Sequence, residues 1–330
     1  MTNTTQIMSE YKFIKDYAQW RDDLGRYESW EEACDRVMDM HKTKYADKLQ
    51  DSEELVEFLE YATQAYKEKL VLASQRSLQF GGEPTLRKQE RMYNCLTSYC
   101  DRIEFFQEAM HWLLCGGGIG FSVQKHHVAK LPPITQRDKG TLTFTVPDTI
   151  EGWADAFGVL ISSYTTANPT FSEYQGYRIE FDLSEIRPEG AMISGGYKAP
   201  GPDGLRASLI KVQEILDAAV SEGVRQLRPI ECYDIVMHMS DAVLSGGIRR
   251  SATLSLFSPD DEEMLTSKTG DWFIKNPQRG RSNNSAILIR GETPKEQFLK
   301  LFESVKQFGE PGIVWAETTE VLYNPLKLAA

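Results

Sequence analysis

The sequence predicts an α/β protein in which a mostly helical N-terminal region precedes a layer of strands and helices. Two patterns indicate this class. Over roughly the first 90 residues, apolar side chains recur at helical spacing, and Gly81, Gly82 and Pro84 end that region. From Tyr93 onward, short apolar runs alternate with amphipathic segments, which is typical of parallel strands joined by helices.

In the helical region, Ser29 and Glu32 have the spacing of a capping box, so we expect a helix to begin after Ser29. Residues 11–20 are expected to form a short helix or an ordered arm. Residues 1–8 are polar, and we expect them to be frayed.

The α/β layer follows in regular order. Strands are expected around 94–98, 118–123, 251–257, 283–289 and 312–315. Helices are expected at 101–114, 203–221, 230–244, 260–268 and 294–307. Asp101 and Asp203 are expected to cap the helices that they precede.

The stretch from about 140 to 183 looks like an insertion into this layer. It has strand-like runs at 142–146 and 177–181, with a helix after Asp148 between them. We therefore divide the chain into a helical region at 1–92 and an α/β region at 93–325 that contains the insertion.

The composition limits the classes of function. The chain has 330 residues and a formal net charge of −11, which argues against nucleic acid or an anionic membrane surface as the main partner. No apolar run is long enough to span a bilayer, and the N-terminus lacks a signal-peptide pattern. Five cysteines in a chain of this length do not resemble a secreted disulfide framework. We expect a cytoplasmic protein with reduced thiols.

The stretch 113–124 combines the end of an apolar helix with a glycine-lined strand. Four glycines let the backbone approach another group closely, so we expect a thiol and a bare backbone to face a substrate: Gly116, Gly117, Gly118 and Gly120. A dinucleotide-binding loop is excluded, because Phe121 replaces the last glycine of that motif and the helix precedes the strand.

No metal site is predicted. The sequence has no C-x-x-C or H-E-x-x-H spacing. His126 and His127 are possible ligands, but neighbours on a strand point to opposite faces. Among the cysteines, Cys34, Cys115 and Cys232 are expected to be packed in or beside helices. Cys95 is open to either a structural or a redox interpretation.

Two loops combine glycines with cations: Gly196 and Lys198 in the first, and Gly246, Gly247, Arg249 and Arg250 in the second. Both can be ordinary turns with glycine at positive φ. The cations also suit phosphate recognition, and the first loop precedes a predicted helix N-terminus. Arg249 is equally compatible with a solvated side chain or a structural ion pair.

Several motifs together resemble the N-terminal part of a ribonucleotide reductase catalytic chain of the adenosylcobalamin-dependent, monomeric, triphosphate-reducing class. They are YAQW at 17–20, SLQFGG at 77–82, YNC at 93–95, the stretches 113–124 and 194–202, GGIRRSA at 246–252, NNS at 283–285, GEPG at 309–312 and NP at 324–325. Their order and number carry the resemblance, which extends over nearly the whole chain.

The resemblance implies a ten-stranded α/β barrel made of two five-stranded halves, with a finger loop through its centre. This chain would be the N-terminal helical region and the first five-stranded half, and would end inside the finger loop. The implied reaction replaces the 2′-hydroxyl of ribonucleoside triphosphates by thiyl-radical chemistry. Its implied cofactor is adenosylcobalamin, held mainly by the other half, and its implied partners are deoxynucleotide effectors and a thioredoxin-like reductant.

The resemblance also implies roles for individual residues. Cys95 matches the first cysteine of the reducing pair, and Asn324 matches an asparagine that hydrogen-bonds the substrate. Asn94, Gly117 and Gly118 would line the substrate site. The loop with Gly246, Gly247, Arg249 and Arg250 resembles the specificity loop, whereas Gly196 and Lys198 would lie near the effector site, which the insertion would complete.

The chain departs from the family at its end. Leu326 stands where the family has the radical cysteine, and residues 326–330 resemble a foreign tail. We therefore expect the chain alone to be inactive as a reductase. Two alternatives remain: a nucleotide-binding half that assembles with a separately encoded C-terminal half, and a fragment of a class I-type large subunit, which would use a separate radical-generating protein.

Overall fold

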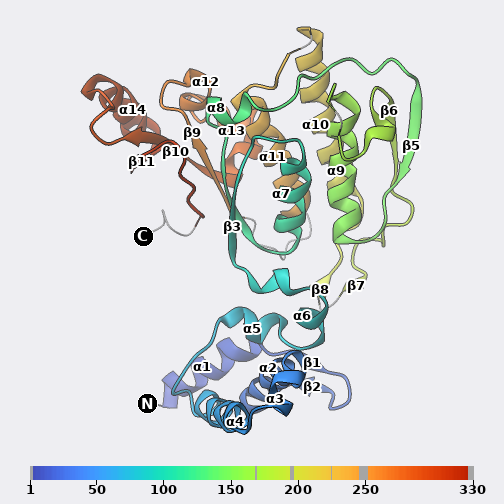
Figure 1. Cartoon of the computed structure of the whole chain (residues 1–330), viewed down its shortest axis with the longest axis vertical. Coiled ribbons are helices and arrows are strands. Elements are labelled where there is room, and N and C mark those ends of the chain that lie inside the picture. The colour runs from blue at the N-terminus through green and yellow to red at the C-terminus, as the bar shows by residue number, and fades with distance from the viewer. Residues whose placement is uncertain (1–2, 168, 194–196, 224, 245–251, 326–330) are drawn as a thin grey trace. The chain divides into compact units, whose positions relative to one another are not determined.

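The computed structural model describes residues 3–167, 169–193, 197–223, 225–244 and 252–325 (Figure 1). The described chain forms two compact units. One comprises Met1–Asn94 with Met192–Lys198, and the other comprises Cys95–Ala191 with Ala199–Ala330.

The first unit consists of short helices and two small ribbons. Its elements are α1 (Asn3–Asp16), β1 (Trp20–Arg21), β2 (Arg26–Tyr27), α2 (Trp30–Lys44), α3 (Ala46–Gln50), α4 (Glu53–Lys67), α5 (Gln75–Phe80), α6 (Glu83–Arg87), η1 (Gln89–Met92), β7 (Met192–Ile193) and β8 (Tyr197–Lys198). The capping box at the start of α2 is confirmed: the Ser29 hydroxyl accepts from the Glu32 N–H, and the Glu32 carboxylate accepts from the Ser29 N–H.

One expectation for this unit is wrong. Residues 3–8 belong to α1 and are not frayed; the helix is held farther along, where Phe13 packs edge-on against Trp30 with ring centroids 5.4 Å apart. The helix expected within 11–20 extends to Asp16, and Trp20 then pairs with Tyr27 in an antiparallel ribbon. The ribbon forms because Gly25, at φ +62°, takes the left-handed conformation that reverses the chain.

The second unit contains the predicted parallel sheet, and this confirms the α/β class. Within the described residues the sheet has five strands: β3 (Cys95–Tyr99), β4 (Gly118–Ser122), β9 (Thr253–Phe257), β10 (Ser282–Ile289) and β11 (Gly312–Ala316). They lie side by side in chain order, and each neighbouring pair is parallel. The ten-stranded barrel stays a prediction.

Helices and short segments connect these strands. They are α7 (Glu104–Leu114), α8 (Lys125–Val128), α9 (Ile150–Tyr164), η2 (Ser172–Tyr174), α10 (Asp203–Ser221), α11 (Pro229–Leu244), α12 (Glu262–Leu265), α13 (Trp272–Lys275), η3 (Pro277–Arg281) and α14 (Lys295–Phe308). The strand–helix–strand pattern predicted between 140 and 183 is confirmed. Its two strands, β5 (Thr141–Thr145) and β6 (Arg178–Asp182), pair in parallel.

The two faces of the five-stranded sheet differ. Alternate strand residues, among them Phe121, Phe257 and Leu288, join the large core formed with α7, α9, α10 and α11. Leu254, Ile287 and other residues of the opposite parity form a second, smaller cluster, which Val321, Leu322 and Tyr323 partly cover. The helices thus lie on one face, while the segment after β11 lies on the other.

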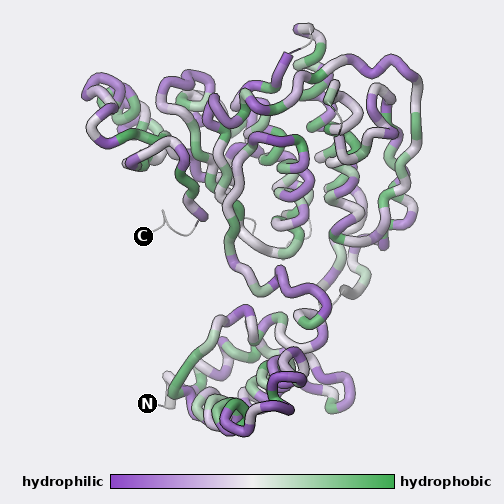
Figure 2. Tube along the Cα trace, viewed as in Figure 1, coloured by the Kyte–Doolittle hydropathy of each residue, from purple (hydrophilic) through white to green (hydrophobic). Residues whose placement is uncertain are grey.

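Figure 2 shows the difference between buried and surface helices along the tube: α14 alternates between hydrophilic and hydrophobic residues. In contrast, α9 is buried along most of its length. Among the described residues, no helix combines the length and apolar character needed to cross a membrane.

Two predicted helix caps and one predicted helix length are wrong, although α10 spans the residues expected, 203–221. Helix α7 begins at Glu104 without a side-chain cap, and Asp101 instead pairs with Arg102 at 3.0 Å. Asp203 is the first residue inside α10 and not its cap. The helix expected at 260–268 is the single turn α12, since Asp261 caps it and the chain leaves helical geometry after Leu265.

A buried ion cluster fixes the start of α11. The Glu231 carboxylate, only 9% exposed, accepts hydrogen bonds from Arg225 at 2.6 and 2.8 Å and from the Arg228 N–H at 2.7 Å. Burial alone would raise the pKa of Glu231, but the hydrogen bonds from Arg225 and Arg228 outweigh it and lower that pKa.

We expect Glu231→Gln to lower the free energy of unfolding at pH 7 by about 1.5–3 kcal/mol, the range for hydrogen bonds to charged groups. A carboxylate with a depressed folded-state pKa stabilises above its unfolded pKa, and this contribution is lost as the pH falls through the folded pKa. The difference between wild type and variant should therefore shrink towards acid pH, as measured by urea unfolding. Glu214→Gln, at a half-exposed carboxylate paired with Lys211, is the control. An equal loss at every pH would contradict this account.

Candidate functional site

Cys95 is the first residue of the edge strand β3. Its neighbour on the adjacent strand β4 is a glycine, which has no side chain. In the parallel register Cys95 pairs with Gly118. A Cβ built on Gly118 would lie 3.2 Å from Cys95 Sγ, so the thiol leans over the bare backbone of β4. Cys95 is half-buried. The expected thiol beside a glycine-lined strand is therefore present.

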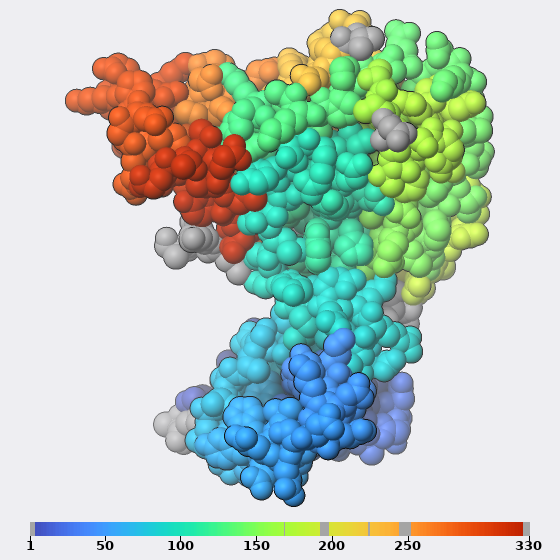
Figure 3. Space-filling view, in the orientation of Figure 1, coloured from blue at the N-terminus to red at the C-terminus, as the bar shows by residue number. Residues whose placement is uncertain are grey.

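The segment after β11 crosses the same face of the sheet. A Cβ on Gly120 would overlap the carbonyl oxygen of Tyr323 and would lie 3.0 Å from Asn324 Cα. A Cβ on Gly118 would lie 3.3 Å from Pro325 Cγ. In the space-filling view the red C-terminal residues lie against teal residues of the same unit (Figure 3). Only glycine at position 120 leaves room for this backbone.

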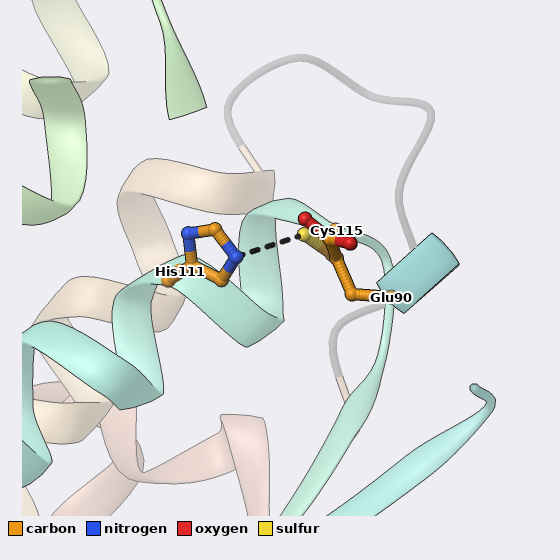
Figure 4. A group of neighbouring side chains, drawn as sticks. All are labelled: Glu90, His111 and Cys115. Atoms are coloured by element: carbon orange, nitrogen blue, oxygen red, sulfur yellow. Dashed lines mark hydrogen bonds between the residues drawn. The ribbon is translucent and has the colours of Figure 1, made fainter. Parts of the chain in front are cut away.

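The turn from α7 into β4 brings the glycine strand to this position. Gly116 adopts φ +80°, which ends the helix, and the Gly117 N–H donates to the Trp112 carbonyl at 3.1 Å. Cys115 in this turn lies 3.6 Å from His111 Nε2 (Figure 4).

Two contacts anchor the crossing segment near the other end of β4. Gln124 Nε2 donates to the Thr319 carbonyl at 2.8 Å. The Glu320 carboxylate lies 2.9 Å from His126 Nε2 and 3.1 Å from His127 Nε2. From Thr319 to Pro325 the segment therefore runs along β4 in the opposite direction and arrives beside Cys95.

Burial and hydrogen bonding set the charges in this anchor. Burial lowers the pKa of His127, although the hydrogen bond with Glu320 opposes that shift. The hydrogen bonds with His127 and His126 lower the pKa of Glu320, so its carboxylate is ionised near neutral pH. His127 Nδ1 also lies 2.9 Å from Ser122 Oγ, which fixes the ring against β4.

The other four cysteines are buried, as is typical of cysteines with a structural role. Cys34, Cys115 and Cys232 are buried, as predicted, and none of the five cysteines is in a disulfide. Burial raises the pKa of Cys34 to about 11. Burial and a hydrogen bond with Cys232 raise the pKa of Cys100. A thiol with a raised pKa is a poor nucleophile at neutral pH, so Cys95 stands apart by its exposure.

The predicted site residues fall into three groups. Cys95, Gly118 and Asn324 come together on the sheet face, with Gly117 just before β4. Asn94 belongs to the first unit, where its side-chain oxygen accepts from Arg76 Nη2 at 2.8 Å. Lys198 also belongs to the first unit, in β8, and is exposed. The remaining predicted residues lie outside the described ones: Gly196, Gly246, Gly247, Arg249 and Arg250.

Sequence reasoning named Gly120 among the glycines that allow close approach, and the structure shows that it makes the closest backbone approach on this face. Two other features of this face were missed. Asn283 and Gly120 both pair with Leu254 on the strand between them, so the three residues lie on the same face of the sheet, and Asn283 is exposed. Glu320 meets the two histidines across the fold, and no local pattern could have indicated that contact.

The two histidines also correct an expectation. The sequence predicts His126 and His127 on a strand, with side chains on opposite faces. The strand in fact ends at Ser122, and both residues lie in the short helix α8, where their rings are 4.0 Å apart and both reach Glu320.

Comparison with known proteins identifies relatives of one kind. The chain is 27% identical to the adenosylcobalamin-dependent ribonucleoside-triphosphate reductase of Lactobacillus leichmannii, over 92% of this chain and 47% of the relative. It is 30% identical to the enzyme of the same name from Lacticaseibacillus paracasei, over 61% of this chain and 30% of the relative. No family model matches the chain.

A solved structure agrees with these relatives. The chain superposes on a B12-dependent, class II ribonucleotide reductase with a TM-score of 0.78 and 25% identity, over 94% of this chain and 49% of that one. The chain spans about half the length of the curated relatives it matches. These matches show homology to class II ribonucleotide reductases and confirm the resemblance drawn from the motifs.

Gly120→Ala tests the close contact between β4 and the segment 319–325, which crosses the sheet face. Because the new methyl group would overlap the Tyr323 carbonyl, we expect the segment to lift, at a cost of about 1–3 kcal/mol, and Cys95 alkylation to become about 5- to 150-fold faster. The measurement is the rate of maleimide labelling, assigned to Cys95 by mass spectrometry. Gly280→Ala is the matched control, since its Cβ would make only an ordinary contact with Trp272 at 3.8 Å. An unchanged labelling rate in Gly120→Ala would refute the claim that the segment 319–325 lies against Gly120 and covers Cys95.

Proposed function

We propose that this chain provides a reducing thiol and part of the substrate face of a ribonucleotide reductase that converts ribonucleoside triphosphates to 2′-deoxyribonucleotides. One observation supports this most directly: Cys95 leans over the bare backbone of Gly118 while Asn324 and Pro325 are held beside the same glycine strand. The names of the homologues support the reaction type.

The proposed chemistry assigns Cys95 the role of reductant. Two thiols give up two hydrogen atoms in total and form a disulfide, while the 2′-hydroxyl leaves as water and a hydrogen takes its place. In the proposed mechanism a thiyl radical on another cysteine starts the reaction by removing the 3′-hydrogen. A thiol on a strand suits this work, because a rigid element holds the sulfur at a fixed distance from the ribose.

The bare glycines support the proposed substrate position. A ribose can approach a strand closely only where Cβ atoms are absent, as at Gly118 beside Cys95. In this proposal Asn324 hydrogen-bonds the substrate through its amide, and Gly117 lies along the same site. Because the net charge is −11, the triphosphate must be held by local groups such as backbone N–H donors.

Neither of two cavities among the described residues fits the relatives' cofactor. Two cavities there hold about 580 and 520 Å³, and neither is lined by Cys95 or by the segment over β4. A cobalamin is far larger than either, so we derive no step through it. The proposal that adenosylcobalamin initiates the radical rests on the names of the homologues.

We also propose that a complementary C-terminal half and a thioredoxin-like reductant complete the system. Within the described sheet, β3 and β11 are edge strands with neighbours on one side only. Such edges readily pair with further strands. The partly covered cluster around Leu254 and Ile287 would gain apolar cover from the same partner.

Leu326 bears on the activity of the chain by itself. Leucine has no thiol, and this position is the one that matches the radical cysteine; it lies outside the described residues. We propose that this chain does not reduce nucleotides without a partner. Deoxynucleotide formation by the chain alone, with adenosylcobalamin and a dithiol, would disprove this statement.

Substrate binding gives the central test. We expect CTP to slow alkylation of Cys95, because the ribose would cover the thiol, and we expect dCTP to protect less, because it lacks the 2′-hydroxyl. Asn324→Ala should weaken CTP protection by about 2- to 10-fold in apparent affinity, the value of one net hydrogen bond. The measurement is the labelling rate as a function of nucleotide concentration.

Asn276→Ala is the control, because Asn276 lies at the C-terminal end of α13 and not on the sheet face. Inorganic triphosphate separates ribose recognition from phosphate binding. The proposal fails if none of the four ribonucleoside triphosphates protects Cys95 or if inorganic triphosphate protects equally well.

The second glycine loop yields a separate prediction. If Arg250 holds an effector phosphate, Arg250→Ala should weaken binding of a deoxynucleoside triphosphate by about 10- to 150-fold, the value of a charge-assisted hydrogen bond. Arg249→Ala is the paired variant, since that side chain is equally compatible with a structural role. Fluorescence titration with a labelled deoxynucleotide measures both, and unchanged affinity in both variants would remove the phosphate-binding interpretation.

A further inference from the structure

His126, His127 and Glu320 form a compact group where α8 meets the segment after β11. One ligating atom from each, a ring nitrogen or a carboxylate oxygen, lies within 4.8 Å of the other two. Imidazole nitrogen and carboxylate oxygen are the ligands that Zn²⁺ and related dications take in sites with three protein ligands. The group lies at the opposite end of β4 from Cys95 and has no part in the proposed reduction.

The distances are close to those of a metal site. His126 Nε2 and His127 Nε2 lie 2.9 and 3.1 Å from the Glu320 oxygens. Tetrahedral Zn²⁺ with bonds of about 2.0–2.1 Å separates its ligands by about 3.3 Å. To admit the ion, these two nitrogen–oxygen separations would lengthen by a few tenths of an ångström, and the three ligating atoms, which lie within 4.8 Å of one another, would adjust to that spacing.

Hydrogen bonding and packing fix the ring of His127. Its Nδ1 lies 2.9 Å from Ser122 Oγ, so the other nitrogen, Nε2, points to Glu320. Ser122 Oγ is itself fixed, because it accepts hydrogen bonds from the Gln124 N–H at 3.3 Å and from Gln124 Nε2 at 3.1 Å. The ring is fully buried and packs against Tyr99, with ring centroids 4.3 Å apart.

The group is also accessible from solvent. The His126 and Glu320 side chains are 39% and 56% exposed, so an ion can enter and water can complete its coordination. Within the described residues, the ion pairs of Glu320 are with the two histidines, whereas the nearby Glu317 pairs with Arg290 at 3.2 Å. Among those residues, therefore, no lysine or arginine forms an ion pair that neutralises the Glu320 carboxylate.

We propose that His126, His127 and Glu320 form a binding site for a transition-metal dication of the Zn²⁺ class. The ion would join α8 to the segment after β11, two parts of the chain 193 residues apart in sequence. Because that segment continues over Gly120 to Cys95, the ion would hold the cover of the thiol in place. This inference rests on the geometry of the three side chains and not on the proposed reductase activity.

The test begins with the chain freed of metal by a chelator. Calorimetric titration with Zn²⁺ should show one ion per chain, with affinity at least about 10-fold weaker in both His126→Ala and Glu320→Ala. Both replaced side chains are partly exposed, and circular dichroism checks that the variants fold. Co²⁺ should bind at the same site without the near-ultraviolet charge-transfer band of a cobalt thiolate, which excludes the cysteines as ligands.

Glu317→Ala is the matched control, because it removes a carboxylate from the same segment without touching the histidines. It should bind Zn²⁺ like the wild type. Zn²⁺ should also slow alkylation of Cys95 in the wild type and in Glu317→Ala, but not in Glu320→Ala. Absence of stoichiometric binding, equal affinity in all variants, or a thiolate band with Co²⁺ would each overturn the proposal and leave a hydrogen-bonded cluster only.

Discussion

The absence of side chains along one face of β4 is the constraint on which the site depends. Gly118 and Gly120 are two residues apart, so both present bare backbone to the same face. The Tyr323 carbonyl occupies the space that a side chain at position 120 would need. This close backbone approach lets the segment after β11 lie flat on the sheet. It also brings Pro325 next to Gly118, the residue that pairs with Cys95.

Because alternate strand residues point to opposite faces, one face of the sheet forms the apolar core and the other carries the candidate site. One face of the sheet contributes large apolar residues such as Phe121 and Phe257 to a core covered by four long helices. The other face presents small or polar residues on β3 and β4, among them Cys95, Gly118 and Gly120. Since a one-residue shift in register would exchange these faces, the buried aromatic residues also fix the thiol on the open side.

The sequence predicted much of this from local patterns. Strand and helix periods identified all five strands and the glycine strand beside Cys95, because both depend on neighbouring residues. The capping roles expected of Asp101 and Asp203 were wrong, because capping depends on where the chain enters the helix, which tertiary packing decides. Contacts between Glu320 and α8 could not be predicted, since no local period links residues almost 200 positions apart.

The contacts of Glu320 with His126 and His127 explain why the segment 319–325 has one fixed position along β4. A segment that crosses a sheet face without ladder hydrogen bonds could slide along it, and one residue of slip would replace the Tyr323 carbonyl by a neighbouring group. The Gln124 contact with Thr319 and the bridge from Glu320 to both histidines fix the first residues of the segment. Gly120 accepts backbone at only one point farther on. Anchor and glycine together determine which residue arrives beside Cys95, so the placement of Asn324 depends in part on contacts made by Thr319 and Glu320, several residues earlier in the chain.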